Sequence, residues 1–189
     1  MNVARILYPV KVLGPGNRIG IWLAGCTRGC PGCSNPELWE QKPEYEIQIS
    51  QLVALIRSLA DKHRVDGFTI TGGEPLLQAT DLLALIDQLS DISTDVLVYT
   101  GFCLEELKDN PDATVSNLLK SIAVLIDGEY VEKLNDNSRL RGSLNQHIHI
   151  FKKQFEDKYR DYIDNQPNQI QNFTTTDGIV SVGIHHKTF

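Results

Sequence analysis

The sequence predicts an α/β fold built on a parallel sheet. Short apolar runs rich in β-branched residues alternate with segments that carry apolar residues at helical spacing. Each apolar run ends in a glycine-rich or polar loop. This alternation is typical of strands joined by crossover helices, and right-handed crossovers place the loops after the strands on one edge of the sheet. The simplest interpretation is one site built from loops that are distant in sequence.

Four buried strands are expected, and an extended segment at residues 6–13 precedes them. The strands are predicted at residues 18–24, 67–71, 95–99 and 121–126. The loops that follow them read GCTRGCPGCSN, GGEP, YTGF and DGEY. Strands in a parallel sheet are covered on both faces, and near-continuous apolar runs of this kind are typical of them.

Helices are expected between the strands. Residues 50–64 carry apolar side chains at i, i+3, i+4 and i+7, with Ser50 as the expected N-cap. That apolar face would consist of Leu52, Leu55, Ile56 and Leu59. Residues 80–89 repeat the pattern, 105–108 predict a short helical piece, and 36–39 predict a short helix after the cysteine loop.

The last third of the chain is less regular. Residues 151–163 predict a charged, exposed helix, and residues 169–173 and 178–184 predict two strands joined as a hairpin. We expect a single domain over residues 1–189, with a core of about 5–146 and a C-terminal extension at 147–189.

Composition and charge bound the function classes. Hydrophobic residues make up 41% and charged residues 22%, which is ordinary for a globular protein. The formal net charge is -6 and no basic stripe stands out, so a nucleic-acid partner is not expected. No apolar run reaches the length of a membrane span, and the N-terminus does not read as a signal peptide. We therefore expect a cytoplasmic protein whose cysteines serve metal binding or catalysis.

Three of the four cysteines lie in one loop, at Cys26, Cys30 and Cys33. Thiolates are soft ligands that select Fe–S clusters, zinc or Cu(I). A closed [4Fe–4S] cluster takes four cysteines and a closed zinc site takes four Cys or His ligands. Three cysteines would leave one iron of a cluster open to a substrate or cofactor. A zinc site of three Cys and one His is the alternative, whereas three cysteines do not form a disulfide framework.

The C-x3-C-x2-C spacing after the first buried strand and the GGEP turn after the second resemble the radical S-adenosylmethionine (SAM) superfamily. Further segments, within residues 5–146, resemble the small activating enzymes of glycyl radical enzymes, above all those of anaerobic ribonucleoside-triphosphate reductase. They read GPGNRIGIWLAGCTRGCPGCSNPELW, TGGEPL, YTGF, LIDGEYVEKL and LRGSLNQ. The resemblance implies an incomplete (β/α) barrel, a partial TIM-like parallel sheet, that a partner protein closes.

The same resemblance implies roles for individual residues. The three loop cysteines, Cys26, Cys30 and Cys33, would hold one [4Fe–4S] cluster, and the open iron would bind the amino and carboxylate groups of SAM. The GGEP turn would hold the SAM amino group, with its glycines leaving room for the cofactor. The expected cofactor-binding residues are Gly32, Cys33, Ser34, Gly72, Gly73, Glu74, Asp127 and Arg141. No catalytic residue is assigned.

Several polar residues keep two interpretations. Asp127 would either contact SAM or substrate, or cap a strand end. Arg139 and Arg141 would either clamp an acidic group or lie at the surface. Cys103 is a structural thiol or a redox-sensitive site. His147 and His149 would share one face of a strand, where a metal site is the alternative to solvated side chains.

The implied reaction is one-electron reduction of the cluster, followed by cleavage of SAM to methionine and a 5′-deoxyadenosyl radical. That radical would take a hydrogen atom from a glycine of a glycyl radical enzyme, such as anaerobic ribonucleotide reductase. Flavodoxin or ferredoxin would donate the electron. A small radical SAM enzyme acting on a small molecule or peptide is one alternative. A non-catalytic zinc or Fe–S electron-transfer protein is another, although the GGEP turn would have no role in it.

Overall fold

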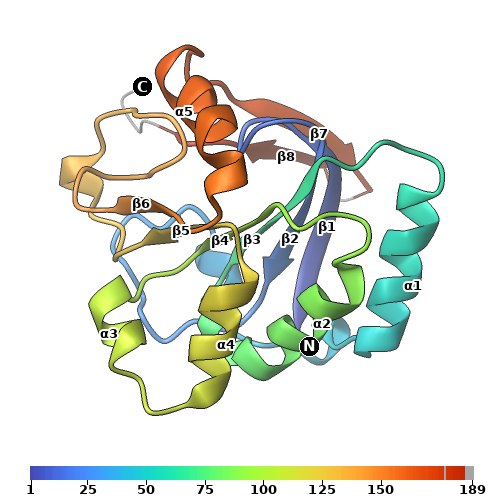
Figure 1. The fold of residues 1–189 in the computed structure, drawn as a ribbon. Helices are drawn as coiled ribbons and strands as arrows, with labels where there is room; N and C mark the ends of the chain where they lie inside the picture. Colours follow the sequence, from blue (N-terminus) through green and yellow to red (C-terminus); the bar gives the residue numbers. More distant parts are fainter. Residues whose placement is uncertain (177, 186–189) are drawn as a thin grey trace.

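The computed structural model describes residues 1–176 and 178–185, and its centre is a six-stranded sheet (Figure 1). The strands follow the chain order β1-β2-β3-β4-β5-β6. Strands β2 to β5 are parallel to one another, whereas β1 and β6 pair antiparallel at the two edges. This confirms the α/β class and the mostly parallel sheet. The division into a core at 5–146 and an extension at 147–189 stays a prediction.

The four predicted strands and the extended first segment are found with shifted ends, whereas β6 was not predicted. The six strands are β1 (Val3–Val10), β2 (Arg18–Leu23), β3 (Gly67–Gly72), β4 (Val96–Tyr99), β5 (Val124–Asp127) and β6 (His147–Ile150). Strand β5 begins later than the predicted residue 121, because Ser121 ends a helix. Within the described ranges, no helix combines the length and apolar character that crossing a bilayer requires.

Helices follow the strands as expected, but the helix predicted at 151–163 begins only at Glu156 and is not simply exposed, since Tyr159 and Tyr162 are buried against the sheet. They are α1 (Ile49–Ala60), α2 (Ala79–Leu89), α3 (Leu104–Lys108), α4 (Ala113–Ser121) and α5 (Glu156–Asp164). The expected N-cap at Ser50 is wrong, since α1 begins one residue earlier and Gln48 is its N-cap. The expected helix at 36–39 is a single 3-10 turn, Pro36–Leu38.

The predicted face of α1 is partly wrong. Leu52 and Ile56 are buried, but Leu55 is 53% exposed. Val53 is buried in its place. The sheet therefore contacts a stripe that is rotated towards Val53, and Leu55 lies at the edge of this stripe. In α2 the predicted apolar residues are all buried.

Helix α4 was not predicted from the sequence. It begins after Asp112, whose side chain accepts a 2.8 Å hydrogen bond from the N–H of Thr114. Val115 and Leu118 of this helix are buried, and Leu119 packs partly buried against the same core. Its apolar residues Val115, Leu118 and Leu119 lie at i, i+3 and i+4, with Ile122 at i+7, so the sequence does carry a helical signal here, which the strand expected from residue 121 obscured.

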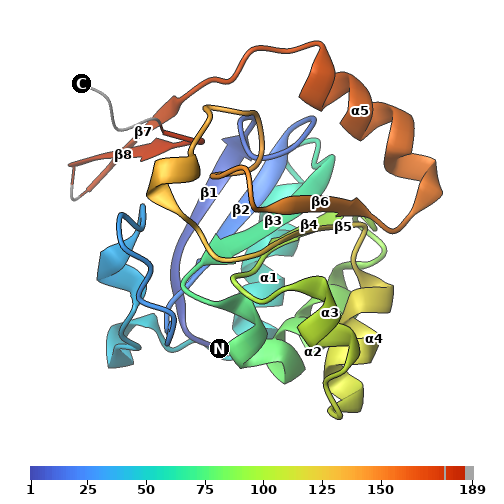
Figure 2. The ribbon, with the colours of Figure 1, turned by 90° about the vertical axis from the view of Figure 1, so that its left-hand side faces the viewer.

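The two faces of the sheet pack against different helices. Val96 and Val98 of β4 join the core beneath α1, α2 and α4, whereas Leu97 faces a second core with Tyr159 and Tyr162 of α5. Figure 2 shows α5 on the opposite side of the sheet from α1, α2 and α4.

A buried charge network fixes α5 to the sheet. Arg18 is fully buried, and its guanidinium lies 3.2 Å from the carboxylate of Asp95. Lys158 reaches the same carboxylate at 2.8 Å, and the Tyr159 hydroxyl donates to it at 2.7 Å. Arg18 also donates to the Thr69 hydroxyl at 2.7 Å. The pattern of apolar residues gives no sign of this network.

The predicted C-terminal hairpin is confirmed. Strands β7 (Gln171–Thr175) and β8 (Gly178–Val182) pair antiparallel, with Phe173 opposite Val180. Val182 packs against Trp22 of the main sheet and against Leu38. The predicted turn includes residue 177 and the predicted extension includes 186–189, and these lie outside the described residues.

Candidate active site

The loops after β2, β3, β4 and β5 meet around one cavity of about 770 Å³. It lies at the carboxyl edge of the parallel strands, where ligands bind in open α/β sheets. These four loops line it with Cys26, Arg28, Cys30, Cys33, Ser34, Asn35, Gly73, Glu74, Thr100, Gly101 and Tyr130. The sequence-based expectation that the loops share one edge is confirmed.

The cysteine loop is shaped by hydrogen bonds of its own backbone. The N–H of Gly25 donates to the Leu38 carbonyl at 2.8 Å, and the N–H of Cys26 donates to the Trp39 carbonyl at 2.9 Å. Between these closing bonds, the N–H of Cys33 donates to the Cys30 carbonyl at 3.1 Å. Cys26, Cys30 and Cys33 are therefore presented on one closed loop.

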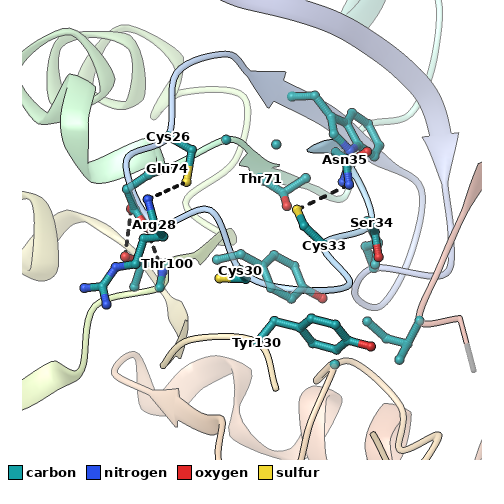
Figure 3. Close-up of a pocket in the computed structure, with 18 of the residues that line it drawn as sticks. Cys26, Arg28, Cys30, Cys33, Ser34, Asn35, Thr71, Glu74, Thr100 and Tyr130 are labelled. Atoms are coloured by element: carbon teal, nitrogen blue, oxygen red, sulfur yellow. Dashed lines mark hydrogen bonds between the residues drawn. The ribbon is translucent and has the colours of Figure 1, made fainter. Parts of the chain in front are cut away.

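The three loop thiols are free and partly exposed. Figure 3 shows the sulfur atoms of Cys26, Cys30 and Cys33 around one open space. Backbone N–H groups approach two of them: Arg28 donates to Cys26 Sγ and Asn35 donates to Cys33 Sγ, each at 3.4 Å. Hydrogen bonds of this kind tune thiolates that hold Fe–S clusters.

Electrostatics around the loop favour a cationic ligand. Burial raises the pKa of the Cys30 thiol. A backbone hydrogen bond at Tyr130 opposes this shift, and the negative charges of Glu129 and Cys33 add to it. A positive centre between the sulfurs would offset that repulsion and favour the thiolate. Within residues 1–176 and 178–185, no group of three or more His, Cys, Asp and Glu side chains is arranged for a single metal ion.

Glu74 ties two loops together. Its carboxylate is 2% exposed and accepts hydrogen bonds from the Thr100 hydroxyl at 2.8 Å and the Gly101 N–H at 2.7 Å. It also accepts from the N–H of Leu76 at 3.0 Å. Its own N–H donates to the Gly25 carbonyl at 2.8 Å. Glu74 thus fixes the GGEP turn relative to both the cysteine loop and the loop after β4.

The glycines of the turn have a packing reason that the sequence did not reveal. A Cβ on Gly72 would lie 2.3 Å from the Leu23 carbonyl oxygen, and one on Gly73 would lie 2.4 Å from the Gly25 carbonyl oxygen. The turn therefore needs glycine because it packs directly on the backbone that enters the cysteine loop.

Comparison with known proteins places this geometry in a family. Residues 12–149 match the family described as a 4Fe-4S single cluster domain. The anaerobic ribonucleoside-triphosphate reductase-activating protein of Salmonella typhi is 34% identical over 150 residues, which cover 75% of this chain and 94% of the relative. The protein of the same name from Escherichia coli K12 is 33% identical over 149 residues, with the same coverage. That from Enterobacteria phage T4 is 30% identical, covering 78% and 93%.

The chain belongs to the family of reductase-activating proteins. This membership confirms the resemblance to the activating proteins of anaerobic ribonucleoside-triphosphate reductase, and the family match adds a 4Fe–4S cluster domain. Among solved structures, QueE from Escherichia coli covers 52% of this chain at a TM-score of 0.44 and 24% identity, which is too partial a likeness to support an argument.

The predicted cofactor-binding residues separate into two groups in this family member. The structure brings Cys33, Ser34, Gly72, Gly73 and Glu74 to the cavity, and places Gly32 beside Glu132. It does not bring Asp127 or Arg141 to the cavity lining. Arg141 pairs with Asp136 at 3.2 Å. The roles of all these residues in cofactor binding stay predictions.

Asp127 and its neighbours occupy the far side of the loop after β4. The Asp127 carboxylate accepts from the N–H of Leu104 at 2.7 Å and of His147 at 3.2 Å, so it caps the start of α3. The imidazoles of His147 and His149 lie 3.5 and 3.1 Å from it, on one face of β6 as expected. Cys103 is exposed and does not line the cavity.

The sequence analysis did not identify Arg28 or Asn135 as lining residues. It expected Arg139 either to clamp an acidic group or to lie at the surface. The Arg28 guanidinium lies 4.3 Å from the centre of the Phe102 ring and 3.7 Å from Glu106. Asn135 lines the cavity. Arg139 is buried against the Tyr162 ring, 3.8 Å from its centre, so it binds the extension. The position of Arg28 inside the cysteine spacing was the one available signal.

Glu74→Gln is expected to lower the free energy of unfolding and to reduce the change of this free energy with pH. An amide nitrogen would face the Gly101 N–H or the Thr100 and Leu76 donors, leaving a buried donor unpaired at a cost of about 1–3 kcal/mol. Urea unfolding of both proteins measures this difference. Glu105→Gln, on the exposed surface of α3, is the control.

The pH dependence has a defined sign. Burial raises the pKa of Glu74, although three hydrogen bonds oppose the shift. The folded chain therefore binds this proton more tightly than the unfolded chain. The stability that Glu74 contributes is full below the ordinary glutamate pKa of about 4.3 and falls as the pH rises through the raised value. If the free energy of unfolding of Glu74→Gln changed with pH as it does in the wild type, Glu74 would not be the source of this pH dependence.

Proposed function

We propose that this protein activates an anaerobic ribonucleotide reductase by generating a glycyl radical on it. The observation that carries the proposal is the direct joining of the GGEP turn to the cysteine loop at one cavity. The Glu74 N–H binds the Gly25 carbonyl, and Gly73 binds the Leu23 carbonyl at 2.7 Å. These bonds would hold a cluster site and an adjacent cofactor site at a fixed position relative to each other, in a chain related to reductase-activating proteins.

The donor set of the loop fits a [4Fe–4S] cluster. Cys26, Cys30 and Cys33 would each ligate one iron, leaving the fourth iron without a protein ligand. Two of the sulfurs already receive backbone N–H groups, from Arg28 and from Asn35. All three thiols face one cavity with room for a further ligand.

SAM would bind beside the open iron, between the cysteine loop and the GGEP turn. When bound together, the reduced cluster and SAM supply the cleavage of SAM to methionine and a 5′-deoxyadenosyl radical. Backbone oxygens of Gly72 and Gly73 would accept from the SAM amino group. Glu74 would orient them rather than bind the cofactor, because its oxygens already accept three protein hydrogen bonds. Ser34 would lie near the adenosine part.

The chain would form an incomplete (β/α) barrel whose open side admits the partner. The four parallel strands β2 to β5 support this interpretation, whereas the antiparallel strands β1 and β6 at the edges depart from it. The glycine of the partner would have to reach the cavity, since hydrogen abstraction needs the reacting atoms about 3–3.5 Å apart. A flavodoxin or ferredoxin would supply the electron, and free thiols of this kind suit a reducing cytosol.

Anaerobic reconstitution tests the proposal. The protein is loaded with iron and sulfide, then given SAM and dithionite, and 5′-deoxyadenosine is measured by chromatography. The anaerobic reductase of the same organism is then added, and its glycyl radical is recorded by electron paramagnetic resonance. We expect 5′-deoxyadenosine in both reactions and the radical only in the second.

Other outcomes identify the alternatives. Bound iron without 5′-deoxyadenosine would point to electron transfer, and bound zinc without iron would point to a structural site. Formation of 5′-deoxyadenosine with no radical on the reductase would overturn the choice of partner. It would favour a radical SAM enzyme that acts on a small molecule or another peptide.

A further inference from the structure

The C-terminal hairpin forms one wall of the active-site cavity. The last residue pairs of β8 and the segment after it line the cavity with Ser181, Val182, Gly183, Ile184 and His185. Figure 2 shows the hairpin on the same side of the molecule as the cysteine loop. The match to the 4Fe-4S domain family ends at residue 149, so this wall lies beyond the matched region. The function proposed above assigns no role to this wall.

Hydrogen bonds at both ends hold the wall in place. Asn135 donates to the His185 carbonyl at 2.7 Å, and Asn168 donates to the Ile184 carbonyl at 2.9 Å. At the opposite end, Gln171 donates to the Pro9 carbonyl at 2.7 Å. Val182 is 3% exposed between these anchors. The segment is therefore a fixed surface of the cavity.

Two backbone N–H groups of this segment have no hydrogen-bond acceptor among the described residues. Pairing between β7 and β8 ends at Val182 opposite Gln171. Within residues 1–176 and 178–185, the N–H groups of Gly183 and Ile184 donate no hydrogen bond to the protein. Carbonyls of the same segment are already engaged by Asn135 and Asn168. A ligand with backbone carbonyls would satisfy the remaining donors.

We infer that residues 181–185 dock the glycine-bearing segment of the partner as an extended peptide, through main-chain hydrogen bonds. Glycine has no side chain to recognise, so main-chain pairing of this kind suits a glycine-centred segment. The wall would set the depth at which the glycine Cα enters the cavity. This inference rests on the proposed function and names the surface of the same site that binds its protein substrate.

Two glycines of the hairpin offer a matched pair of variants. Gly183 has φ +134°, and a Cβ there would lie 2.5 Å from the Gln169 carbonyl oxygen, so the wall must shift. Gly178 has φ +128°, and a Cβ there would meet nothing within 4 Å. Alanine therefore strains the backbone similarly at both positions but displaces the wall only at Gly183.

The first experiment measures binding without turnover. A fluorescently labelled synthetic peptide that carries the radical-site glycine of the reductase is titrated with the reconstituted protein, and anisotropy gives its Kd. We expect Gly183→Ala to weaken binding about tenfold, which is about the contribution of one main-chain hydrogen bond, and Gly178→Ala to match the wild type. Circular dichroism confirms that both variants fold. Equal Kd values for the two variants would overturn the inference.

The second experiment separates the inference from the proposed function. Glycyl radical formed on the intact reductase is divided by 5′-deoxyadenosine formed. We expect this ratio to fall about tenfold in Gly183→Ala, with 5′-deoxyadenosine still produced. A raised KM for SAM at an unchanged ratio would make the hairpin a cofactor wall and overturn the inference alone. No radical with the wild-type protein would overturn the proposed function as well.

Discussion

Cys30→Ala is expected to lose the cluster and, with it, cleavage of SAM. Cys30 lies between the other two loop thiols in sequence, and like them it lines the cavity. Loss of a neighbouring group that only orients a metal ligand already costs about 10–100-fold in affinity or activity. Removing a ligand should therefore reduce 5′-deoxyadenosine formation by more than about 100-fold. Iron analysis, the visible absorption of the cluster and chromatography measure the effect.

The matched control is Cys103→Ser, which also removes one thiol. Cys103 is exposed, does not line the cavity and stands at the N-cap of α3. Serine is a favourable N-cap residue, so this variant should fold, bind iron and cleave SAM as the wild type does. If Cys30→Ala kept wild-type iron and turnover, or if Cys103→Ser lost them, the assignment of the three ligands would be wrong.

The part of the site that the sequence predicted is the part that local sequence encodes. Strand ends, the cysteine spacing and the GGEP turn lie in short segments, and parallel topology alone brings them to one edge. Asp127 shows the limit of this reasoning. Its strand-end position suggested a place at the cavity, but its carboxylate turns to the N–H of Leu104, 23 residues earlier. The direction of a side chain depends on partners that periodicity does not reveal.

The hairpin shows the same limit at a larger scale. Its two strands were predicted from their own composition and turn, and their pairing is confirmed. Its position beside the cysteine loop depends on amide side chains elsewhere in the chain, Asn135 and Asn168. Neither residue belongs to a recognisable motif. Local pattern therefore predicted the hairpin, and the structure shows which of its residues line the cavity.

Asp95→Ala is expected to produce the largest loss of stability. Arg18 and Asp95 are both buried, and the Asp95 carboxylate also accepts from Tyr159. Burial raises the pKa of Tyr159 well above its ordinary value, so the hydroxyl stays protonated and remains a donor. Removing the carboxylate leaves the Arg18 charge buried without its partner, which typically costs about 3–5 kcal/mol. The midpoint temperature of thermal unfolding should therefore fall by about 10 °C for a chain of this size.

The control is Asp91→Ala, which removes the same side chain from an exposed pair. Arg57 contacts Asp91 through two hydrogen bonds of 2.8 and 2.9 Å, but both side chains face solvent. Exposed ion pairs contribute little even with good geometry, so its unfolding temperature should stay near that of the wild type. If Asp95→Ala does not fold, Asp95→Asn keeps an acceptor for Tyr159 and should unfold between the two.

This prediction also bears on why α5 is part of the fold. Lys158 and Tyr159 come from α5, whereas Arg18 begins β2 and Asp95 immediately precedes β4. Without α5, the second face of β4 and β5 and the charge network beneath it would meet water. Tyr159→Phe should therefore cost about 1 kcal/mol or more, since it removes one donor to a charged buried acceptor. A Tyr159→Phe variant as stable as the wild type would show that Arg18 and Lys158 alone satisfy Asp95.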